Sequence, residues 1–393
     1  MADPEKLRHV ARRVVQTQRD GHEVVVVVSA MGKTTDDLLA LSQQVCGAPS
    51  RRELDMLTTA GERISMALLS MAIREEGGEA ISFTGSQAGI LTNDRHVDAS
   101  IIEVRPVRVQ DELARDRIVI VAGYQGMSYK REITTLGRGG SDTTAVALAA
   151  ALDAEWCEIC SDVDGVYSAD PRVVNEARRI PELSYEETQE MAESGAKVLN
   201  AQAVEFARQS NIAIYARATT GPVPGTDPSA DGTVVRKNPP RLPGSVSSVT
   251  SERSLILLHA ELPDATPLLA LLDEMEIRAK QLQVLTVHEK RQRISMVLSQ
   301  TNLPPFDGIR ERLVSEFGEA IGVVEGCGAA SAIGTGINAS YLNLRRGQGV
   351  LADLAIREIF TSSFRITWLL PDNVLETAVR RLHQEFLEGE NRT

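Results

Sequence analysis

The sequence contains no apolar run long enough to span a membrane and no excess of basic residues. A membrane-spanning helix needs about 20 apolar residues, whereas residues 1–20 are charged and amphipathic and lack the apolar core of a signal peptide. The formal net charge of -12 argues against a surface that binds nucleic acid. These absences predict a cytoplasmic protein that binds neither a membrane nor nucleic acid.

Cysteine and histidine are also scarce, with four and six copies. Cys157 and Cys160 have the spacing of half a zinc or redox site. They lie within a run of β-forming residues, however, and the chain has no second cysteine pair and no cluster of histidines. We therefore expect no metal centre built from these residues.

What the sequence does contain is a glycine-rich loop between a buried strand and an alanine-rich helix. The loop at 136–144 reads Leu-Gly-Arg-Gly-Gly-Ser-Asp-Thr-Thr. An apolar run at 118–121 predicts the strand, and Ser141 or Asp142 is expected to cap a helix over 144–152. Glycines let a ligand approach the backbone, and the N–H groups of a first helical turn favour an anion. The loop therefore predicts a site for a phosphate or a carboxylate.

A second polar loop follows the next predicted strand, at 156–160. It covers 161–172 and holds three aspartates, a tyrosine and an arginine, which is more than a simple connection requires. Polar loops at strand ends are where open α/β sheets bind ligands. Two such loops in succession predict one shared binding site.

The segments before residue 218 are predicted to form helices and strands. Five valines at 24–28 predict a strand that is covered on both faces, and the polar loop at 29–35 adds to the same site. Helical spacing is found at 4–19, 54–73, 109–115, 185–193 and 198–209, a further helix begins near Asp36, and other strands are predicted at 79–83, 101–104 and 212–216.

The second half of the chain changes in pattern and predicts separate domains. Residues 219–243 are rich in proline, glycine and polar residues and form a predicted linker. Two stretches of about seventy residues then repeat the order β, α, β, β, α, which predicts domains at 244–318 and 319–393 after a first domain at 1–218. The predicted strands are 255–262, 283–287, 294–298, 321–324, 350–355 and 364–370, and the helices are 267–275, 309–317, 337–344 and 374–386.

Five motifs, in order along the chain, resemble the successive signatures of aspartokinases. They are Ser-Ala-Met-Gly at 29–32, Ala-Gly-Glu-Arg-Ile-Ser at 60–65, Phe-Thr-Gly-Ser-Gln-Ala-Gly at 83–89, and the loops at 134–144 and 161–172. The resemblance extends over 2–218 and implies the amino-acid-kinase fold, a three-layer α/β sandwich with a mostly parallel sheet between helices. It also implies ATP-dependent phosphorylation of the β-carboxylate of L-aspartate to 4-phospho-L-aspartate.

Matching positions imply roles for individual residues. Taken alone, Glu62 beside Arg63 on a helix would indicate a solvated surface pair, but the resemblance places Glu62 at the ammonium group of aspartate and Arg138 at a carboxylate. The implied contacts to the amino acid are Thr35, Glu62, Arg138, Gly139, Gly140 and Ser141. The implied contacts to ATP are Ser29, Ser161, Asp162, Tyr167, Ser168, Ala169, Asp170, Pro171, Arg172 and Lys197. The implied catalytic residues are Asp142, Arg138 and Lys197, with Asp142 orienting a lysine or helping to hold Mg²⁺ that arrives with ATP.

The two βαββα units resemble the paired ACT modules that bind regulatory amino acids in aspartokinases, which implies a homo-oligomer assembled through them. The family's effector turn reads Asp-x-Pro-Gly, whereas the turn at 262–267 reads Leu-Pro-Asp-Ala-Thr-Pro and lacks glycine. The second unit keeps glycines at 326, 328 and 336. Effector binding and a purely structural, dimerising role both stay open for these units.

One family segment is absent from this sequence. Aspartokinases ordinarily begin with a strand that leads into Lys-Phe-Gly-Gly-Thr-Ser, whose lysine neutralises the transferred phosphoryl group. The alternative function is therefore a catalytically impaired relative that binds an amino acid and acts as a regulatory subunit. Because Met1 stands where the family has a valine, we expect the natural protein to begin upstream, with a GTG codon taken for a start. Acetylglutamate and glutamate kinases share the fold, but the residues of these motifs favour aspartate as the substrate.

Overall fold

A computed structural model describes residues 3–388 except 138, 197–198, 222–231, 240–241, 276, 289–290, 301–302 and 304–305. The chain packs as two units. The first comprises Met1–Val166, Arg179–Gln189 and Lys197–Pro239, and the second comprises Tyr167–Arg178, Glu190–Ala196 and Pro240–Thr393. Two short segments that the sequence analysis placed in the first domain, 167–178 and 190–196, thus pack with the second unit.

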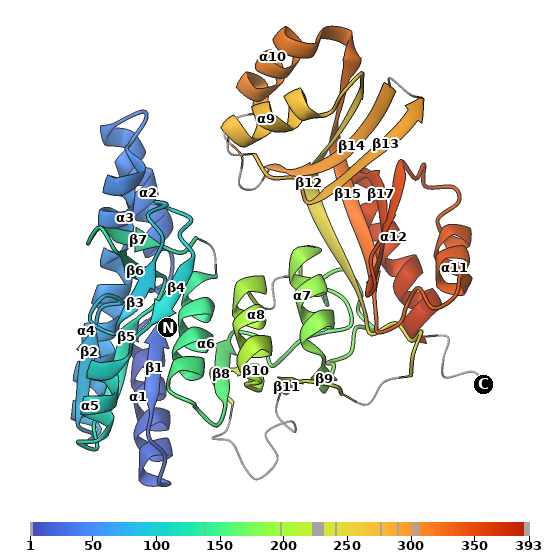
Figure 1. Cartoon of the computed structure of the whole chain (residues 1–393). Coiled ribbons are helices and arrows are strands. Elements are labelled where there is room, and N and C mark those ends of the chain that lie inside the picture. The colour runs from blue at the N-terminus through green and yellow to red at the C-terminus, as the bar shows by residue number, and fades with distance from the viewer. Residues whose placement is uncertain are drawn as a thin grey trace. The chain divides into compact units, whose positions relative to one another are not determined.

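The first unit is built around a parallel sheet with the order β1-β5-β2 (Figure 1). Its strands are β1 (Val25–Val28), β5 (Ile118–Ala122) and β2 (Ala80–Phe83), and its helices include α1 (Pro4–Arg19), α4 (Ala60–Glu75), α5 (Val107–Leu113) and α6 (Gly140–Ala151). Ile118 and Ile120 of β5 pack against α1 and α4, whereas Val119 and Val121 pack against α5 and α6. The predicted sheet with helices on both faces is confirmed.

The described residues of the first unit form two further sheets. One has the order β8-β10-β11-β9, and the other has the order β4-β3-β6-β7. Their strands are β8 (Cys157–Ser161), β10 (Ile214–Ala218), β11 (Gly232–Val235), β9 (Glu182–Leu183), β4 (Ile101–Val104), β3 (Ile90–Thr92), β6 (Gln125–Ser128) and β7 (Ile133–Thr135). Strand β11 lies inside the predicted linker and pairs with β10, so that prediction is wrong for 232–235. Residues 222–231 and 240–241 of the linker lie outside the described residues.

Strands β1 and β8 each lie at the end of a sheet. Among the described residues, β1 pairs only with β5, and β8 pairs only with β10. Helix α1 reaches both strands, because it covers β1 with apolar residues while Arg13 forms an ion pair with Glu158 of β8 at 2.8 Å. The further strand that the family resemblance implies stays a prediction.

Several helix boundaries differ from the sequence predictions. The helix predicted at 54–73 is divided at Thr59 into α3 (Arg51–Thr58) and α4. Ser50 caps α3 by accepting a hydrogen bond from the backbone N–H of Glu53, which explains its earlier start. The other helices are α2 (Thr34–Val45), α7 (Tyr185–Glu193) and α8 (Ala201–Ser210). Asn200 caps α8, so this helix begins three residues later than the predicted 198.

In the part of the second unit that the structure describes, the strands form a sheet with the order β13-β14-β12-β15-β17-β16. Its strands are β12 (Ser248–Leu262), β13 (Gln281–His288), β14 (Arg291–Ser299), β15 (Ile321–Ile333), β16 (Glu358–Thr361) and β17 (Arg365–Pro371). Its helices are α9 (Thr266–Glu274), α10 (Phe306–Phe317), α11 (Leu342–Val350) and α12 (Leu375–His383). The repeated order βαββα is confirmed. Two elements are displaced from their predicted positions. The helix predicted at 337–344 lies at 342–350, and the strand predicted at 350–355 lies at 358–361.

The two halves of this sheet are interlocked. The second part of β12, from Leu255 to Leu262, pairs with β14, whereas its first part, from Ser248 to Glu252, pairs with the end of β15. The start of β15 pairs in turn with the second part of β12. Each βαββα half thus receives a strand segment from the other. The sequence analysis predicted two separate, consecutive domains and did not predict this exchange.

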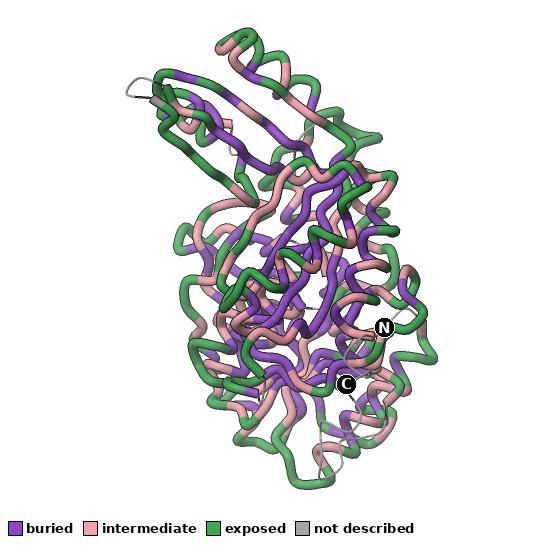
Figure 2. The backbone as a smooth tube through the Cα atoms, turned by 90° about the vertical axis from the view of Figure 1, so that its right-hand side faces the viewer, coloured by how far each residue is buried: buried purple, intermediate pink, exposed green. Residues whose placement is uncertain are grey.

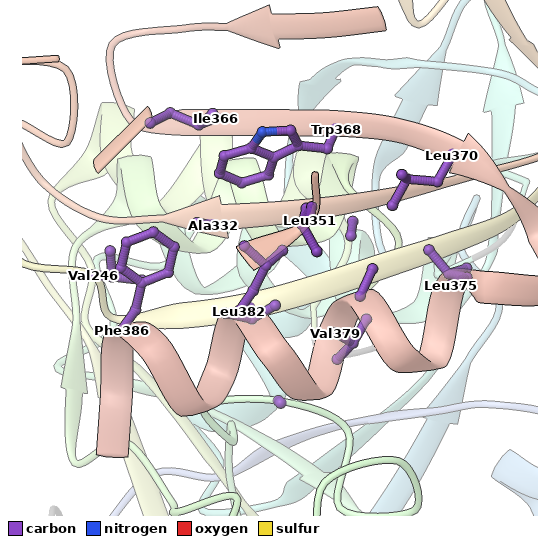
Figure 3. Packing of buried hydrophobic residues seen from close by; sticks show 14 of the residues in the cluster. Val246, Ala332, Leu351, Ile366, Trp368, Leu370, Leu375, Val379, Leu382 and Phe386 are labelled. Carbon is purple, nitrogen blue, oxygen red and sulfur yellow. The ribbon is translucent and has the colours of Figure 1, made fainter. Parts of the chain in front are cut away.

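Each half of the second unit has its own apolar core. In the C-terminal half, Leu375, Val379 and Leu382 of α12 pack against β15 and β17, together with Trp368 and Phe386 (Figure 3). In the other half, α9 and α10 cover β12 and β14.

Buried residues concentrate on the strands, and exposed residues lie on outer helix faces and loops (Figure 2). No helix among the described residues has the length and apolar character that crossing a bilayer requires.

Candidate active site

The glycine-rich loop leads into the N-terminus of α6. The helix begins at Gly140, directly after Gly139, whose φ of +72° is a left-handed value that favours glycine. Ser141 and Asp142 thus lie in the first turn, and the prediction that one of them caps the helix is wrong. A Cβ atom on Gly123, just after β5, would lie 2.8 Å from Ser141 Oγ. The end of the central strand therefore meets a helical turn whose N–H groups suit an anion.

Asp142 is a partly buried carboxylate in that first turn. Burial raises its pKa from the ordinary 3.8 to about 6. Its charge contributes, after burial itself, to raising the pKa of the Cys157 thiol to about 12, so Asp142 lies near β8. No described residue lowers the pKa of Asp142. The carboxylate is therefore placed to accept a cation that arrives with a ligand.

Glu62 is the second buried carboxylate of the site. It lies in the first turn of α4 and is 3% exposed. Its Oε1 atom accepts a hydrogen bond of 3.0 Å from the backbone N–H of Ala30, whereas its Oε2 atom is buried without a hydrogen-bond partner among the described residues. Burial raises the pKa of this carboxyl group. An unpaired buried acceptor is costly unless a ligand satisfies it.

The loop after β1 lies against the start of α4. A Cβ atom on Gly61 would come within 2.7 Å of the Ala30 side chain, so the close approach requires glycine. Ser29 precedes Ala30 and is exposed, and Thr35 is half-buried in the first turn of α2. The structure therefore brings the predicted residues Ser29 and Thr35 to the junction that also holds Glu62.

Tyr124 is a site residue that the sequence analysis missed. Its φ is +66°, and its hydroxyl group lies close to the side chains of Thr135 and Thr58. Burial, and to a smaller extent the charge of Glu62, raises the pKa of Tyr124. A Cβ atom on Gly140 would lie 3.1 Å from the Tyr124 ring. Tyr124 thus connects the Glu62 region with the glycine-rich loop, and its position directly after Gly123 and a buried strand was the available sequence signal.

Asn200 is a second residue that the sequence analysis missed. Its Oδ1 atom accepts hydrogen bonds from the Thr143 hydroxyl at 3.2 Å and from the backbone N–H of Gln202 at 2.8 Å. Its side chain occupies the space that a Cβ atom on Gly139 would need, at 2.7 Å. Asn200 therefore joins the N-termini of α6 and α8. Two predicted site residues, Arg138 and Lys197, lie outside the described residues.

Ser161 and Asp162 follow β8, as predicted. The Ser161 hydroxyl donates to the carbonyl of Val163 at 3.1 Å and accepts from its N–H at 3.2 Å, which forms a tight turn. The Ser161 carbonyl accepts from the backbone N–H of Thr219 at 2.8 Å. Asp162 is exposed beside this turn. Their contact with a nucleotide stays a prediction.

The rest of the predicted nucleotide loop, Tyr167–Arg172, packs with the second unit. Ser168 is buried, and its hydroxyl contacts His383 Nε2 at 2.9 Å and accepts from the N–H of Arg178 at 2.9 Å. Ala169 is part of the apolar core there. The side chains of Ser168 and Ala169 thus anchor this segment within the second unit. Their contact with a nucleotide stays a prediction. Asp170 and Arg172 form an exposed ion pair at 2.7 Å beside Pro171.

The described residues contain no group of three or more histidine, cysteine, aspartate or glutamate side chains that could hold a metal ion. The four cysteines are free thiols. Cys157 and Cys160 point to different sides of β8, because alternate residues of a strand face opposite ways, and Cys160 Sγ lies 3.9 Å from Arg13. The pair therefore offers no half-site for a metal.

Comparisons with known proteins agree with this architecture. Residues 1–216 match the model of the amino acid kinase family. The aspartokinase of Mycobacterium tuberculosis (strain CDC 1551 / Oshkosh) is 44% identical over 397 residues, which cover 98% of this chain and 93% of that protein. The aspartokinase of Corynebacterium glutamicum is 41% identical over 396 residues, with 98% and 93% covered.

A solved structure agrees as well. The crystal structure of Escherichia coli aspartokinase III in complex with aspartate and ADP has a TM-score of 0.81 and 25% identity, covering 95% of this chain and 96% of that one. Four findings lead to the same assignment: the parallel sheet, the loop that ends on α6, the repeated βαββα units, and sequence identity above 40% over nearly the full chain. The chain belongs to the aspartokinases of the amino acid kinase family.

Proposed function

We propose that the chain transfers the γ-phosphoryl group of ATP to the β-carboxylate of L-aspartate and forms 4-phospho-L-aspartate in the cytoplasm. The observation that carries this proposal is the buried Oε2 atom of Glu62, which has no hydrogen-bond partner among the residues that the structure describes. A lone carboxylate oxygen in a buried position needs a cationic partner, and the ammonium group of an amino acid supplies one. The Escherichia coli relative was crystallised with aspartate and ADP, which supports the same pair of ligands here.

On the amino-acid side, Glu62 accepts hydrogen bonds from the ammonium group. Thr35 and Ser141 contribute hydroxyl groups, and Arg138 contributes the guanidinium group that clamps a carboxylate. In the reaction, an oxygen of the β-carboxylate forms a bond to the γ-phosphorus, and the bond to the β–γ bridging oxygen of ATP breaks. ADP leaves with that electron pair. The substrate carboxylate is already ionised at neutral pH, so no general base is needed.

On the nucleotide side, the N-terminus of α6 faces the phosphate groups. The N–H groups of Gly139, Gly140 and the first turn stabilise negative charge, as helix N-termini do. Ser29, Ser161, Asp162 and Lys197 complete the proposed contacts. Mg²⁺ bound with ATP supplies further charge neutralisation. Asp142, which no described cation pairs with, orients a lysine or contacts that ion.

An assay of ADP release tests the proposed reaction. One preparation is supplied in turn with aspartate, glutamate and acetylglutamate at saturating ATP and Mg²⁺. We expect release only with aspartate, together with an acyl phosphate that hydroxylamine traps as a hydroxamate. Binding of aspartate without ADP release would contradict the proposal and support a regulatory subunit. Release with one of the other two acids would identify a different substrate.

We also propose that the chain forms a homo-oligomer through strand β13. This strand lies at the edge of the sheet of the second unit. Apolar residues are exposed on both of its faces, namely Leu282 at 49%, Val284 at 40%, Leu285 at 47% and Val287 at 43%. Unpaired edge strands pair with other strands, and a second copy offers the same apolar edge.

Replacing Val284 and Leu285 together with lysine is therefore expected to weaken self-association at least about tenfold, because like charges would meet across the pairing. Sedimentation velocity at several protein concentrations measures this change. The control is Val45→Lys on α2 in the first unit, where the valine is 82% exposed. An unchanged mass distribution in the double variant would exclude β13 as the contact.

We propose further that amino-acid effectors bind weakly at the first βαββα half. Asp264 accepts hydrogen bonds from both the N–H and the hydroxyl of Thr266, at 3.0 and 2.8 Å. The N–H of Ala265 donates to Gln292 Oε1 at 2.7 Å. The N–H groups of Ala265 and Thr266 are thus already used, and Ala265 occupies the place of the family's turn glycine. An effector carboxylate would have to displace these internal acceptors.

Titration with lysine and threonine, alone and together, tests the weak effector site. We expect half-inhibition only above about 1 mM, which corresponds to a binding free energy weaker than about -4 kcal/mol. Aspartokinase III of Escherichia coli has been crystallised with lysine and aspartate, so that protein is a positive control. Inhibition of this chain at micromolar concentrations would show that the turn binds effectors despite its sequence.

A further inference from the structure

Asp55 of α3 is fully buried, with 0% of the residue exposed, and no sequence motif indicates it. Its Oδ1 atom accepts hydrogen bonds from the hydroxyl of Thr135 at 2.6 Å and from the N–H of Val97 at 3.0 Å. Its Oδ2 atom contacts His96 Nδ1 at 2.6 Å. A buried charge is retained only where both oxygens are satisfied. Asp55 therefore fixes three groups from two other segments of the chain.

Both segments lie beside the glycine-rich loop. Thr135 is the last residue of β7, directly before Leu136 and Gly137. The N–H of Ala99 donates to the Thr135 carbonyl at 2.8 Å, and a Cβ atom on Gly137 would lie 3.2 Å from Asp98 Oδ1. The turn at 96–99 thus packs directly against the start of the loop.

This turn is held in an unfavourable backbone conformation. Val97 has a φ of +74°, which is rare for a β-branched residue and persists only when the surroundings enforce it. The hydrogen bond from Val97 N–H to Asp55 is such a constraint. Loss of the Asp55 acceptor would release the turn and, with it, the contact to Thr135 and Gly137.

A series of contacts leads from Asp55 to the first turn of α6. The Thr135 side chain, which donates to Asp55, also lies close to the Tyr124 hydroxyl. The Leu136 N–H donates to the Tyr124 carbonyl at 2.9 Å. Tyr124 in turn packs against Gly140. A continuous series of contacts therefore leads from Asp55 through Thr135 and Tyr124 to the anion site.

We propose that Asp55 is a positioning residue for the amino-acid side of the active site. It touches no reacting atom; it acts through Thr135 and Tyr124, which set the ends of the glycine-rich loop opposite Glu62. The effect on aspartate rests on the proposed function, whereas the effect on the loop does not. Small displacements of substrate-positioning groups can cost about 10²-fold in rate, so a loosened loop is expected to reduce the use of aspartate more than that of ATP.

Thr135 provides the sharpest test because two matched substitutions are available. Thr135→Val removes the hydroxyl group and keeps the shape, whereas Thr135→Ser keeps the hydroxyl group. Asp55→Asn removes the charge itself. The control is Glu112→Gln on α5, since Glu112 is also a buried carboxylate and is bound by Arg115 and Arg117 at 2.7 Å each. Hydrogen–deuterium exchange of the peptide 136–142, without substrate, is the first readout.

We expect about tenfold faster exchange in this peptide for Thr135→Val and Asp55→Asn, and nearly unchanged exchange for Thr135→Ser and Glu112→Gln. In steady-state kinetics, kcat/KM for aspartate should fall about tenfold in the first two variants, while KM for ATP changes less than about threefold. Unchanged exchange in Thr135→Val would overturn the proposal. Equal losses for aspartate and ATP would overturn its assignment to the amino-acid side.

The exchange experiment also separates this proposal from the proposed function. A parent protein without aspartate-dependent ADP release would refute the function, and the exchange of 136–142 would still decide the role of Asp55. Thermal unfolding of each variant shows whether faster exchange is confined to the loop. Faster exchange throughout the first unit would mean general destabilisation and would count against a positioning role.

Discussion

Glu62→Gln is expected to lower kcat/KM for aspartate by about 10²–10³-fold, or roughly 3–4 kcal/mol, because the substrate ammonium loses a buried ionic partner. Glutamine keeps the shape of the side chain, and its carbonyl oxygen can still accept the hydrogen bond from the Ala30 N–H. Its amide group, however, carries no charge to offset the ammonium. Kinetics with each substrate varied separately measure the effect, and KM for ATP is expected to change less than about threefold.

The same variant should be more stable than the parent at pH values above the raised pKa of Glu62. Burial raises the pKa of Glu62 above its ordinary 4.5. The neutral side chain therefore contributes its whole stabilisation of the folded state below pH 4.5, and this stabilisation is lost as the pH rises through the raised pKa. Glutamine does not ionise, and the gain should vanish near pH 4. The control is Glu75→Gln at the exposed end of α4. A variant that uses aspartate as well as the parent would refute the role of Glu62.

Asp142→Asn is expected to lower kcat by about 10²–10³-fold, the usual cost of removing one electrostatic contact to the reacting groups. The pKa of Asp142 is about 6, so kcat/KM of the parent should rise with pH through that value as the carboxylate ionises. The variant should lack this rise. A pH–rate profile of both proteins between pH 5 and 8, with aspartate limiting, measures the difference. The control Asp111→Asn replaces an exposed aspartate on α5.

Asp142→Asn should also stabilise the protein at neutral pH. The pKa of Asp142 in the folded protein is about 6, above the ordinary 3.8. The neutral carboxyl group therefore contributes its whole stabilisation of the folded state below pH 3.8, and this stabilisation is lost as the pH rises through about 6. This difference corresponds to at most roughly 3 kcal/mol, and partial exposure reduces the expected gain to about 1–2 kcal/mol at pH 8. Thermal unfolding at pH 4 and pH 8 measures this gain in stability. Equal midpoint temperatures for variant and parent at both pH values would contradict the raised pKa of Asp142.

Long periodic and apolar segments were predictable from the sequence. The valines of β1 and the apolar run of β5 are covered on both faces, because a segment without polar side chains can only lie inside a parallel sheet. The glycine-rich loop before α6 and the two βαββα repeats were predictable for a similar reason. Their local conformations depend on neighbours in the sequence: glycine at a left-handed position, a regular helical period, or alternating strand residues.

Short strands were not predictable, because their partners are distant in the sequence. Strands β3 and β7 have three residues each, and β11 has four. Such segments carry too few residues for a period to be visible. They form because other strands supply hydrogen-bond partners, as β10 does for β11. The exchange of strand segments between β12 and β15 is likewise a property of the whole sheet.

The sequence by itself determined the family, the order of the long elements and the residue types that can bind an anion and an ammonium group. Only the tertiary structure decided that one oxygen of Glu62 has no partner among the described residues, that Ser168 and Ala169 are buried in the second unit, and that Asp55 contacts Thr135 beside the glycine-rich loop. The physical reason is that desolvation and hydrogen bonding depend on groups brought together from distant segments. Asp55 and Thr135 are eighty residues apart, and no local pattern encodes their contact.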